Sequence, residues 1–294
     1  MLSVATLALT AAGGARTPAV AVVTTAGVEA YAQTLEGIRD QLPDVQIWDA
    51  RDEAHLRENL NKQVVTLAVA VGSDASAVLR RLAPAQVVLV NSVALEWEVE
   101  HGGTPELYKA TVTIDLPPGV LINELKRLFP GKRRIGMIRG PMQTAASVRA
   151  FEQAARQSGF TVEVLTCGDP RDLLERFLQF KSRADLVWCP PNPNLYTTAT
   201  LKPLLVASLT NRLPIIGFSE QFVRAGALFG GSADFVEVGR QTAELALRIA
   251  RNEPVPAHQD ARKFRFAYNE RVARLLGVKA TGLDGPADRL LVIR

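Results

Sequence analysis

Cysteine and histidine are scarce in this chain. Only two cysteines, Cys167 and Cys189, occur among 294 residues, which excludes the dense disulfide framework of small secreted domains. The three histidines, His55, His101 and His258, lie far apart, and no two have the spacing of metal ligands. No glycine-rich phosphate-binding loop follows any expected strand. We therefore expect neither a metal site nor a cofactor.

Strong charge and long apolar runs are also absent. The formal net charge is +4, the basic residues are scattered, and the aromatic residues, 6% of the chain, do not interleave with them. This pattern lacks the footprint of nucleic-acid binding. No segment is long and apolar enough to span a membrane as a helix. A chain of 294 residues exceeds the usual size of a single core, so two lobes are expected.

The first residues differ in composition from the rest. Residues 2–15 form an uncharged run of small and apolar residues with the length of a signal-peptide core. The run Gly13-Gly14-Ala15 could serve as a cleavage site, although no basic leader precedes it. Either the true start lies upstream, or the run is an apolar tail. We expect residues 1–17 to be a signal-peptide remnant of an exported, periplasmic protein.

Short apolar strands alternate with helical patterns along nearly the whole chain, which predicts an α/β fold with parallel strands and right-handed crossovers. The pattern lapses into an expected loop at 92–109 and then starts again, so two doubly wound halves of similar layout are predicted. The expected strands are 20–24, 45–48, 65–71, 86–90, 110–114, 134–138, 161–165, 186–188, 214–218, 226–230 and 263–268.

The two cysteines each follow an expected strand of the second half. In a doubly wound sheet the strand at 134–138 would lie between those two strands. The α-carbons of Cys167 and Cys189 would then be about 10 Å apart, roughly two inter-strand spacings and beyond the reach of a disulfide. We predict two free, buried thiols.

The run 214–241 contains the clearest sign of a connection between two lobes. A Gly-Gly-Ser-Ala-Asp stretch, 230–234, is expected to break the chain after a strand, because glycine permits unusual backbone angles. A long amphipathic helix follows from Phe235, and Asp234 is placed to cap its first turn. We interpret the run as a hinge.

Several segments resemble the ABC transporter substrate-binding family, which has the type I periplasmic binding protein fold. The most similar are 214–256, PIIGFSEQFVRAGALFGGSADFVEVGRQTAELALRIARNEPVP, and 263–278, KFRFAYNERVARLLGV; 112–138 and 284–294 follow. The resemblance implies two Rossmann-like lobes joined by three hinge strands near 113–118, 232–234 and 257–264. Lobe 1 would comprise 18–115 and 235–257, and lobe 2 would comprise 116–234 and 258–294.

Candidate ligand-binding residues lie where expected strands end, because open α/β sheets bind ligands outside the carboxyl ends of their strands. Hydroxyl and amide groups dominate among them, which suits a small polar ligand. In lobe 1 they are Thr24, Thr25, Ser73, Asp74 and Asn91; in lobe 2 they are Arg139, Gln143, Thr144, Asn192, Asn194, Ser219 and Glu220; at the hinge they are Ser232 and Asp234.

Each candidate also has a purely structural explanation. Thr25, Ser73 and Asp74 are ordinary helix-capping residues. The Arg139 guanidinium could clamp a ligand carboxylate or pair with Glu220 across the strand ends. Asn192 and Asn194 could be turn formers, and Trp97 is the tryptophan expected nearest the cleft. The sequence leaves these alternatives open.

The resemblance implies an extracytoplasmic solute-binding protein of an ABC importer, which captures a small polar ligand by hinge closure and delivers it to an ABC permease. Its relatives favour an amino acid or a related carboxylate as the ligand. A monomer is expected, and no enzyme activity. The rival functions are a hydrolase-like enzyme, because 217–221 begins like a nucleophile elbow without its closing glycine, and a ligand-sensing domain of the same fold.

Overall fold

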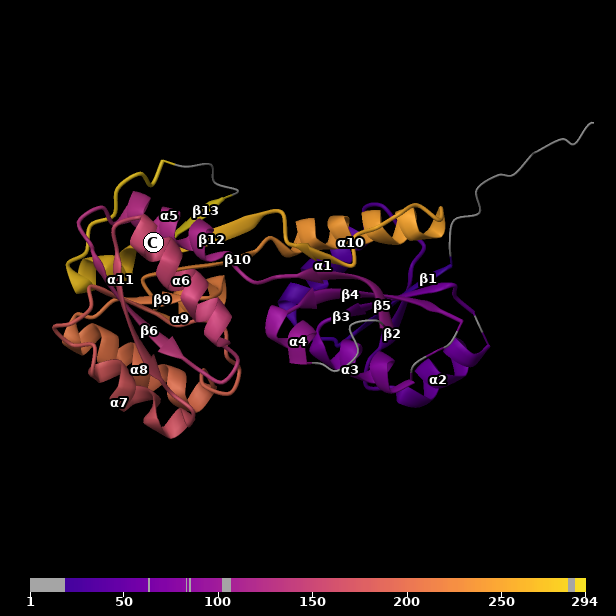
Figure 1. The fold of residues 1–294 in the computed structure, drawn as a ribbon, viewed down its shortest axis with the longest axis horizontal. Helices are drawn as coiled ribbons and strands as arrows, with labels where there is room; N and C mark the ends of the chain where they lie inside the picture. The colour runs from indigo at the N-terminus through magenta and orange to yellow at the C-terminus, as the bar shows by residue number, and fades with distance from the viewer. Residues whose placement is uncertain (1–18, 63, 83, 85, 102–106, 285–288) are drawn as a thin grey trace, which may run out of the picture.

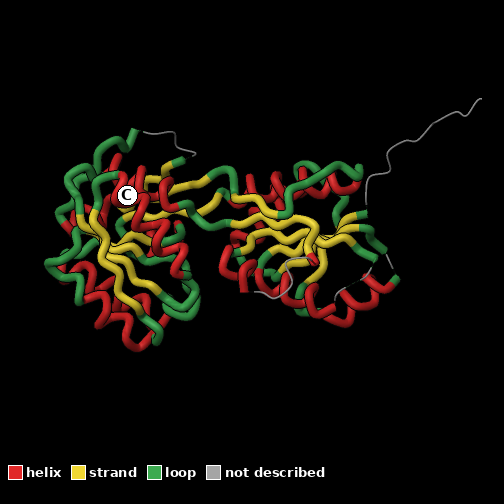
Figure 2. The backbone as a smooth tube through the Cα atoms, in the orientation of Figure 1, coloured by secondary structure: helices red, strands yellow, loops and turns green. Residues whose placement is uncertain are grey.

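The computed structural model describes residues 19–62, 64–82, 84, 86–101, 107–284 and 289–294. The expected signal-peptide remnant, 1–17, lies outside the described residues. The chain forms two α/β lobes, each built on its own sheet with helices on both faces (Figures 1 and 2). The predicted fold, two Rossmann-like lobes joined by three connections, is confirmed.

Lobe 1 contains a sheet in the order β11-β5-β4-β3-β1-β2, and every pair in it is parallel. Its central strand β3 is buried along its whole length, as its apolar sequence predicts. Its strands are β1 (Val20–Thr24), β2 (Gln46–Asp49), β3 (Leu67–Val71), β4 (Val88–Ala94), β5 (Tyr108–Thr113) and β11 (His258–Asp260).

The helices of lobe 1 cover the two faces of this sheet with separate apolar clusters. Ile38 and Val238 pack with Val22 on one face, whereas Leu56 and Leu79 pack with Val23 on the other. The first face is covered by α1 (Glu29–Arg39) and α10 (Phe235–Ala250), and the second by α2 (Glu53–Asn61) and α3 (Ser73–Leu82); the short α4 (Glu96–His101) follows β4.

Lobe 2 contains a sheet in the order β13-β12-β10-β9-β8-β6-β7, in which only the β10–β12 pair is antiparallel. Its strands are β6 (Arg134–Arg139), β7 (Thr161–Thr166), β8 (Leu186–Trp188), β9 (Ile215–Gly217), β10 (Phe229–Ala233), β12 (Phe264–Asn269) and β13 (Leu290–Ile293). Its helices are α5 (Pro118–Leu128), α6 (Ala145–Gln157), α7 (Leu173–Leu178), α8 (Thr198–Asn211), α9 (Glu220–Ala225) and α11 (Glu270–Leu276), with the 3-10 turn η2 (Pro170–Asp172) before α7.

The chain passes between the lobes three times. The connections run from β5 to α5, from β10 to α10 and from β11 to β12 (Figure 1). The third connection begins later than the boundary expected at residue 257. His258, Gln259 and Asp260 form β11, which pairs with β5 and so belongs to the sheet of lobe 1.

The expected chain break at 230–234 is wrong. Gly230, Gly231 and Ser232 lie inside β10, and the glycines serve close packing instead of a turn. A Cβ atom on Gly231 would lie 2.5 Å from the ring of Phe266, and one on Gly230 would lie 2.7 Å from the carbonyl oxygen of Gly217. The strand expected at 226–230 also begins three residues later, because Gly226 ends the short helix α9.

The prediction of two free, buried thiols is confirmed. Cys167 follows β7 and Cys189 follows β8, and β6 lies between these two strands as expected. Burial raises the pKa of Cys189 to about 12, so this thiol stays protonated at neutral pH.

Candidate functional site

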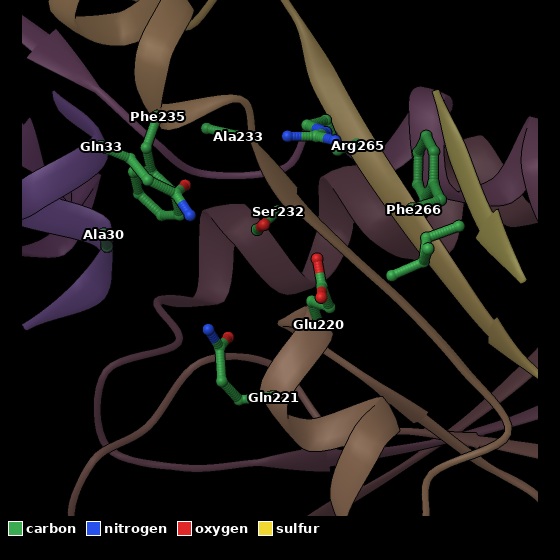
Figure 3. A pocket seen from close by; sticks show the side chains of 10 residues that line it. Ala30, Gln33, Glu220, Gln221, Ser232, Ala233, Phe235, Arg265 and Phe266 are labelled. Carbon is green, nitrogen blue, oxygen red and sulfur yellow. The ribbon is translucent and has the colours of Figure 1, made fainter. Parts of the chain in front are cut away.

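A pocket of about 60 Å³ lies where the two lobes meet (Figure 3). Lobe 1 contributes residues from α1 and α10, and lobe 2 contributes residues from α9, β10, β12 and β13. Helices α1 and α9 follow strands β1 and β9, so the pocket lies at the carboxyl ends of strands from both sheets. Its lining comprises Ala30, Gln33, Glu220, Gln221, Ser232, Ala233, Phe235, Arg265, Phe266 and Leu291.

In lobe 1 the candidate residues surround the start of α3. The Thr25 hydroxyl donates to Asp74 Oδ2 at 3.5 Å, and the Ser73 hydroxyl donates to Glu98 Oε1 at 2.5 Å. Thr24 Oγ1 and Asn91 Oδ1 are buried and have no hydrogen-bond partner among the described residues. Since buried polar atoms are usually paired, these two oxygens are available to a ligand or to water.

Tyr31 on α1 lies beside the start of α3, and the sequence did not single it out. Its ring lies over Gly72, where a Cβ atom would come within 2.2 Å of it, and Gly72 has a φ of +89°. Burial raises the pKa of Tyr31, and the nearby carboxylates of Asp74 and Glu98 add to the increase. The start of α3 is therefore acidic around the partly buried phenol of Tyr31.

In lobe 2 the loops after β6 and β8 are joined by Gln143. Its Nε2 donates to the carbonyl oxygen of Pro191 at 2.9 Å, and its Oε1 accepts from the Gly140 N–H at 3.0 Å. Arg139 Nε donates to the carbonyl oxygen of Gln143 at 3.1 Å. Thr144 caps α6 by accepting from the Ser147 N–H at 3.1 Å. Gln143 and Thr144 thus fix the loop that positions Arg139.

Asn192 forms the turn that its sequence context allows. Its Oδ1 accepts from the N–H groups of Asn194 and Leu195 at 3.1 and 3.2 Å, and its side chain is buried. Its Nδ2, however, has no hydrogen-bond partner among the described residues. Asn194 is exposed in the same turn.

The remaining candidates lie near the hinge. Ser219 caps α9 by accepting from the Phe222 N–H at 3.2 Å, and Asp234 caps α10 by accepting from the Glu237 N–H at 3.2 Å, as predicted for Asp234. Glu220 forms an ion pair with Arg224 at 2.7 Å. Of the two alternatives for Arg139, pairing with Glu220 is therefore not formed.

The pocket brings Glu220 and Ser232 together with three polar residues that sequence reasoning missed, Gln33, Gln221 and Arg265. Gln221 was missed because the helix α9 was not expected. Arg265 was missed because the sequence does not show which strand pairs with β12. The other candidates lie outside the pocket lining. Trp97 stacks on His101 within α4, with ring centroids 5.0 Å apart.

Two kinds of feature are missing from the described part of the chain. It contains no group of three or more His, Cys, Asp or Glu side chains that could hold a metal ion. Its helices are all too short or too polar to cross a membrane.

Comparison with known proteins finds similarity in both sequence and fold. Residues 120–282, more than half of the chain, match the family model of the ABC transporter substrate-binding proteins. No curated protein sequence matches significantly. A ligand-free, open substrate-binding protein with adhesive properties from Clostridium difficile is similar in structure, with a TM-score of 0.73 and 14% identity over 95% of this chain and 99% of that one.

Two further solved structures share the fold. The ABC domain from Streptococcus pneumonia in complex with L-Trp has a TM-score of 0.66 and 16% identity, over 95% of this chain and 100% of that one. A periplasmic ribose ABC transporter protein from Conexibacter woesei has a TM-score of 0.59 and 12% identity, over 88% of this chain and 94% of that one. At these identities the structural likeness shows the fold alone.

Proposed function

This chain belongs to the ABC transporter substrate-binding protein family, and we propose that it is the extracytoplasmic solute-binding protein of an ABC importer. The proposed protein captures a small polar ligand between its lobes and closes over it by rotation at the three connections. The observation that carries this proposal is the pocket at the lobe junction, which is lined by polar side chains of both lobes.

Closure requires a ligand that touches both lobes. A ligand with equal affinity for the open and closed forms does not shift the equilibrium between them. A ligand that contacts one lobe alone binds both forms equally, so it does not drive the rotation. The proposed contacts come from both lobes: Ser73 and Asp74 lie after β3 of lobe 1, and Arg139 and Asn192 lie at the ends of β6 and β8 of lobe 2. All fourteen candidates named from the sequence remain proposed ligand contacts, either directly or through the loops that they hold.

An amino acid or a related carboxylate is the proposed ligand class. Arg139 forms no ion pair with any carboxylate of the described residues, so its guanidinium is free to bind an anionic group of the ligand. The related domain from Streptococcus pneumonia was solved with L-Trp, which supports the same class. The proposed partner is the membrane-embedded permease of the importer, the proposed location is the periplasm, and the proposed state is a monomer.

Native mass spectrometry of gently purified protein tests this function directly. We expect a small molecule to accompany the protein, and its mass would give the ligand class. A thermal-shift screen of amino acids, nucleosides and sugars should then raise the melting temperature with one class only. A second screen for hydrolysis of esters and nucleosides, with Ser219→Ala as control, is expected to show no turnover. Turnover that Ser219→Ala abolishes, with no ligand stabilisation, would contradict the proposal.

A further inference from the structure

A carboxylate outside the pocket lining, that of Glu29, orders two amides that belong to the lining. Glu29 Oε1 accepts from Gln33 Nε2 at 3.2 Å, and Glu29 Oε2 accepts from Gln221 Nε2 at 2.8 Å. Gln33 lies on α1 of lobe 1 and Gln221 lies on α9 of lobe 2, so this carboxylate links the two lobes. Because each amide nitrogen is directed to Glu29, the amide oxygens remain as hydrogen-bond acceptors beside the pocket.

Glu220 adds a negative charge to the same pocket. Its carboxylate points toward Ser232 in Figure 3, between the two amides and the hinge strand. Among the described residues it forms one ion pair, with Arg224, and both side chains are substantially exposed, at 56% for Arg224 and 41% for Glu220. An ion pair this exposed is weak, so the Glu220 carboxylate remains able to accept a hydrogen bond from a second cation. The amides and Glu220 form the acceptor side of the pocket.

Arg265 forms the donor side. Arg265 on β12 lies directly opposite Ser232 on β10 in the antiparallel register, so the two side chains stand on one face of the hinge strands. Figure 3 shows the Arg265 guanidinium at the edge of the pocket that Ser232 lines. No carboxylate among the described residues forms an ion pair with Arg265. A free guanidinium beside a hydroxyl is a good receptor for a carboxylate.

From this arrangement we infer that the pocket binds the head group of an α-amino acid, with its ammonium and its carboxylate in separate halves. The carboxylate is bound by Arg265 and the Ser232 hydroxyl. The ammonium donates to Glu220 and to the amide oxygens of Gln33 and Gln221. This assignment rests on the proposed function and specifies which end of the ligand the hinge receives.

The size of the pocket limits what it can hold. A volume of about 60 Å³ has room for a few water molecules or a head group of similar size, but not for a large side chain. The ligand side chain must therefore extend out of the pocket, between the rims of the lobes. The head group contacts α1 of lobe 1 as well as α9 and β12 of lobe 2, so its binding favours the closed arrangement.

Arg139 lies far along the sheet from Arg265. The strands β6 and β12 are separated by β8, β9 and β10, which places the two residues roughly 19 Å apart, about four inter-strand spacings. The Arg139 guanidinium is also held at its own strand end, because its Nε donates to the carbonyl oxygen of Gln143. We therefore assign Arg139 to the end of the ligand that lies away from its α-carboxylate.

Calorimetry on the full chain tests this assignment with L-amino acids, including L-tryptophan and L-glutamate, each beside its α-amide and its N-acetyl derivative. The amide lacks the carboxylate charge and the N-acetyl form lacks the ammonium. We expect the unmodified protein to bind the free amino acid at least about tenfold more tightly than either derivative, the loss expected for one charge-assisted hydrogen bond. Because this comparison uses the unmodified protein, it does not depend on a variant that folds.

Arg265→Ala should remove the preference for the free acid over the amide, and Glu220→Gln should reduce the preference over the N-acetyl form. Arg262→Ala is the matched control, because Arg262 is an exposed arginine just before β12 whose guanidinium pairs with Glu244 at 2.6 Å.

Equal affinity of the unmodified protein for acid and amide overturns the head-group assignment and leaves the transport function intact. The same holds if the preference survives in Arg265→Ala or is lost in Arg139→Ala instead. Failure to bind any free amino acid overturns both the head group and the proposed ligand class.

Discussion

Asp115 holds a carboxyl group at the connection between β5 and α5. It accepts from the Glu96 N–H at 2.6 Å. Burial raises the pKa of Asp115 to about 6, and repulsion from Glu96 and Glu98 opposes its ionisation further. Its pKa in the unfolded chain is about 3.9, so the folded protein binds more protons than the unfolded chain between about pH 4 and pH 6. The stability that protonation provides is complete below this window and is lost as the pH rises through it.

Asp115→Asn should therefore raise the melting temperature at pH 7.5 and have little effect at pH 4. The asparagine oxygen can still accept from the Glu96 N–H, while the buried negative charge is removed. Thermal melts at pH 4, 5, 6 and 7.5 measure the effect, with the exposed turn residue variant Asp44→Asn as control. A lower melting temperature for Asp115→Asn at pH 7.5 would mean that the ionised carboxylate stabilises the fold.

Arg139→Ala should weaken ligand binding at least about tenfold, the cost of one lost charge-assisted contact. Arg139 lies at the carboxyl end of β6 and its Nε is fixed on the carbonyl of Gln143, so its guanidinium is positioned before a ligand arrives. Calorimetry with the ligand identified by mass spectrometry measures the change. Arg149→Ala, an exposed arginine on the following helix α6, should bind as the unmodified protein does. Unchanged affinity for Arg139→Ala would remove this residue from the site.

Short-range rules predicted the residues whose role is local. Asp234 was placed by its position one residue before a helical pattern, and it caps α10. Arg265 and Gln33 were not recognisable, because their importance depends on which strand and which helix come to lie opposite them. Strand pairing between β10 and β12 and the approach of α9 to α1 are tertiary facts. The candidate site could thus be placed at the strand ends, but its pocket could not.

At the scale of elements, helices α1 and α10 touch backbone to backbone. A Cβ atom on Gly37 would lie 1.9 Å from the carbonyl oxygen of Val236, and one on Gly239 would lie 2.0 Å from that of Thr34. Both neighbours are main-chain atoms of helices and cannot rotate away. The Arg240–Asp40 ion pair at 2.7 Å lies beside this contact. Only glycine at both positions allows the helices to approach so closely.

Gly239→Ala should destabilise the protein by about 1–3 kcal/mol, because the methyl group forces the two helices apart. Gly119→Ala is the matched control: a Cβ atom there meets nothing within 4 Å, and alanine in a helix is favoured over glycine by up to about 1 kcal/mol. Chemical denaturation of both variants measures the difference. Equal stability of Gly239→Ala and the unmodified protein would show that the helices can separate without cost.

The helices and strands could be predicted where the pattern of apolar residues in the sequence is distinct. The strands β1 and β8 have their expected bounds. The helices α4 and α9, with six residues each, were missed because one and a half turns give no periodic pattern. The strand β11 was missed because its three residues are polar, whereas the equally short β8 is apolar and buried; the miss displaced the third connection.

At the scale of the whole molecule, the lobes are joined mainly by the chain itself. Within the described residues, no helix or strand of one lobe packs extensively on an element of the other. The hydrogen bond between Gln221 and Glu29 is a side-chain contact that joins them, and both partners are exposed. The sequence predicted two lobes from its repeated alternation, but nothing in that pattern specifies the angle between them. That angle is set by weak contacts and is therefore free to change when a ligand binds.

Small-angle scattering should accordingly show a smaller radius of gyration when the protein is saturated with its ligand. Each lobe has its own sheet and apolar clusters, so we expect the lobes to rotate as rigid bodies without internal change. At one fixed, subsaturating ligand concentration Arg139→Ala should contract less than the unmodified protein, because fewer molecules are occupied, whereas Arg149→Ala should contract equally. A ligand that raises the melting temperature and leaves the scattering curve unchanged would show that binding does not need the second lobe.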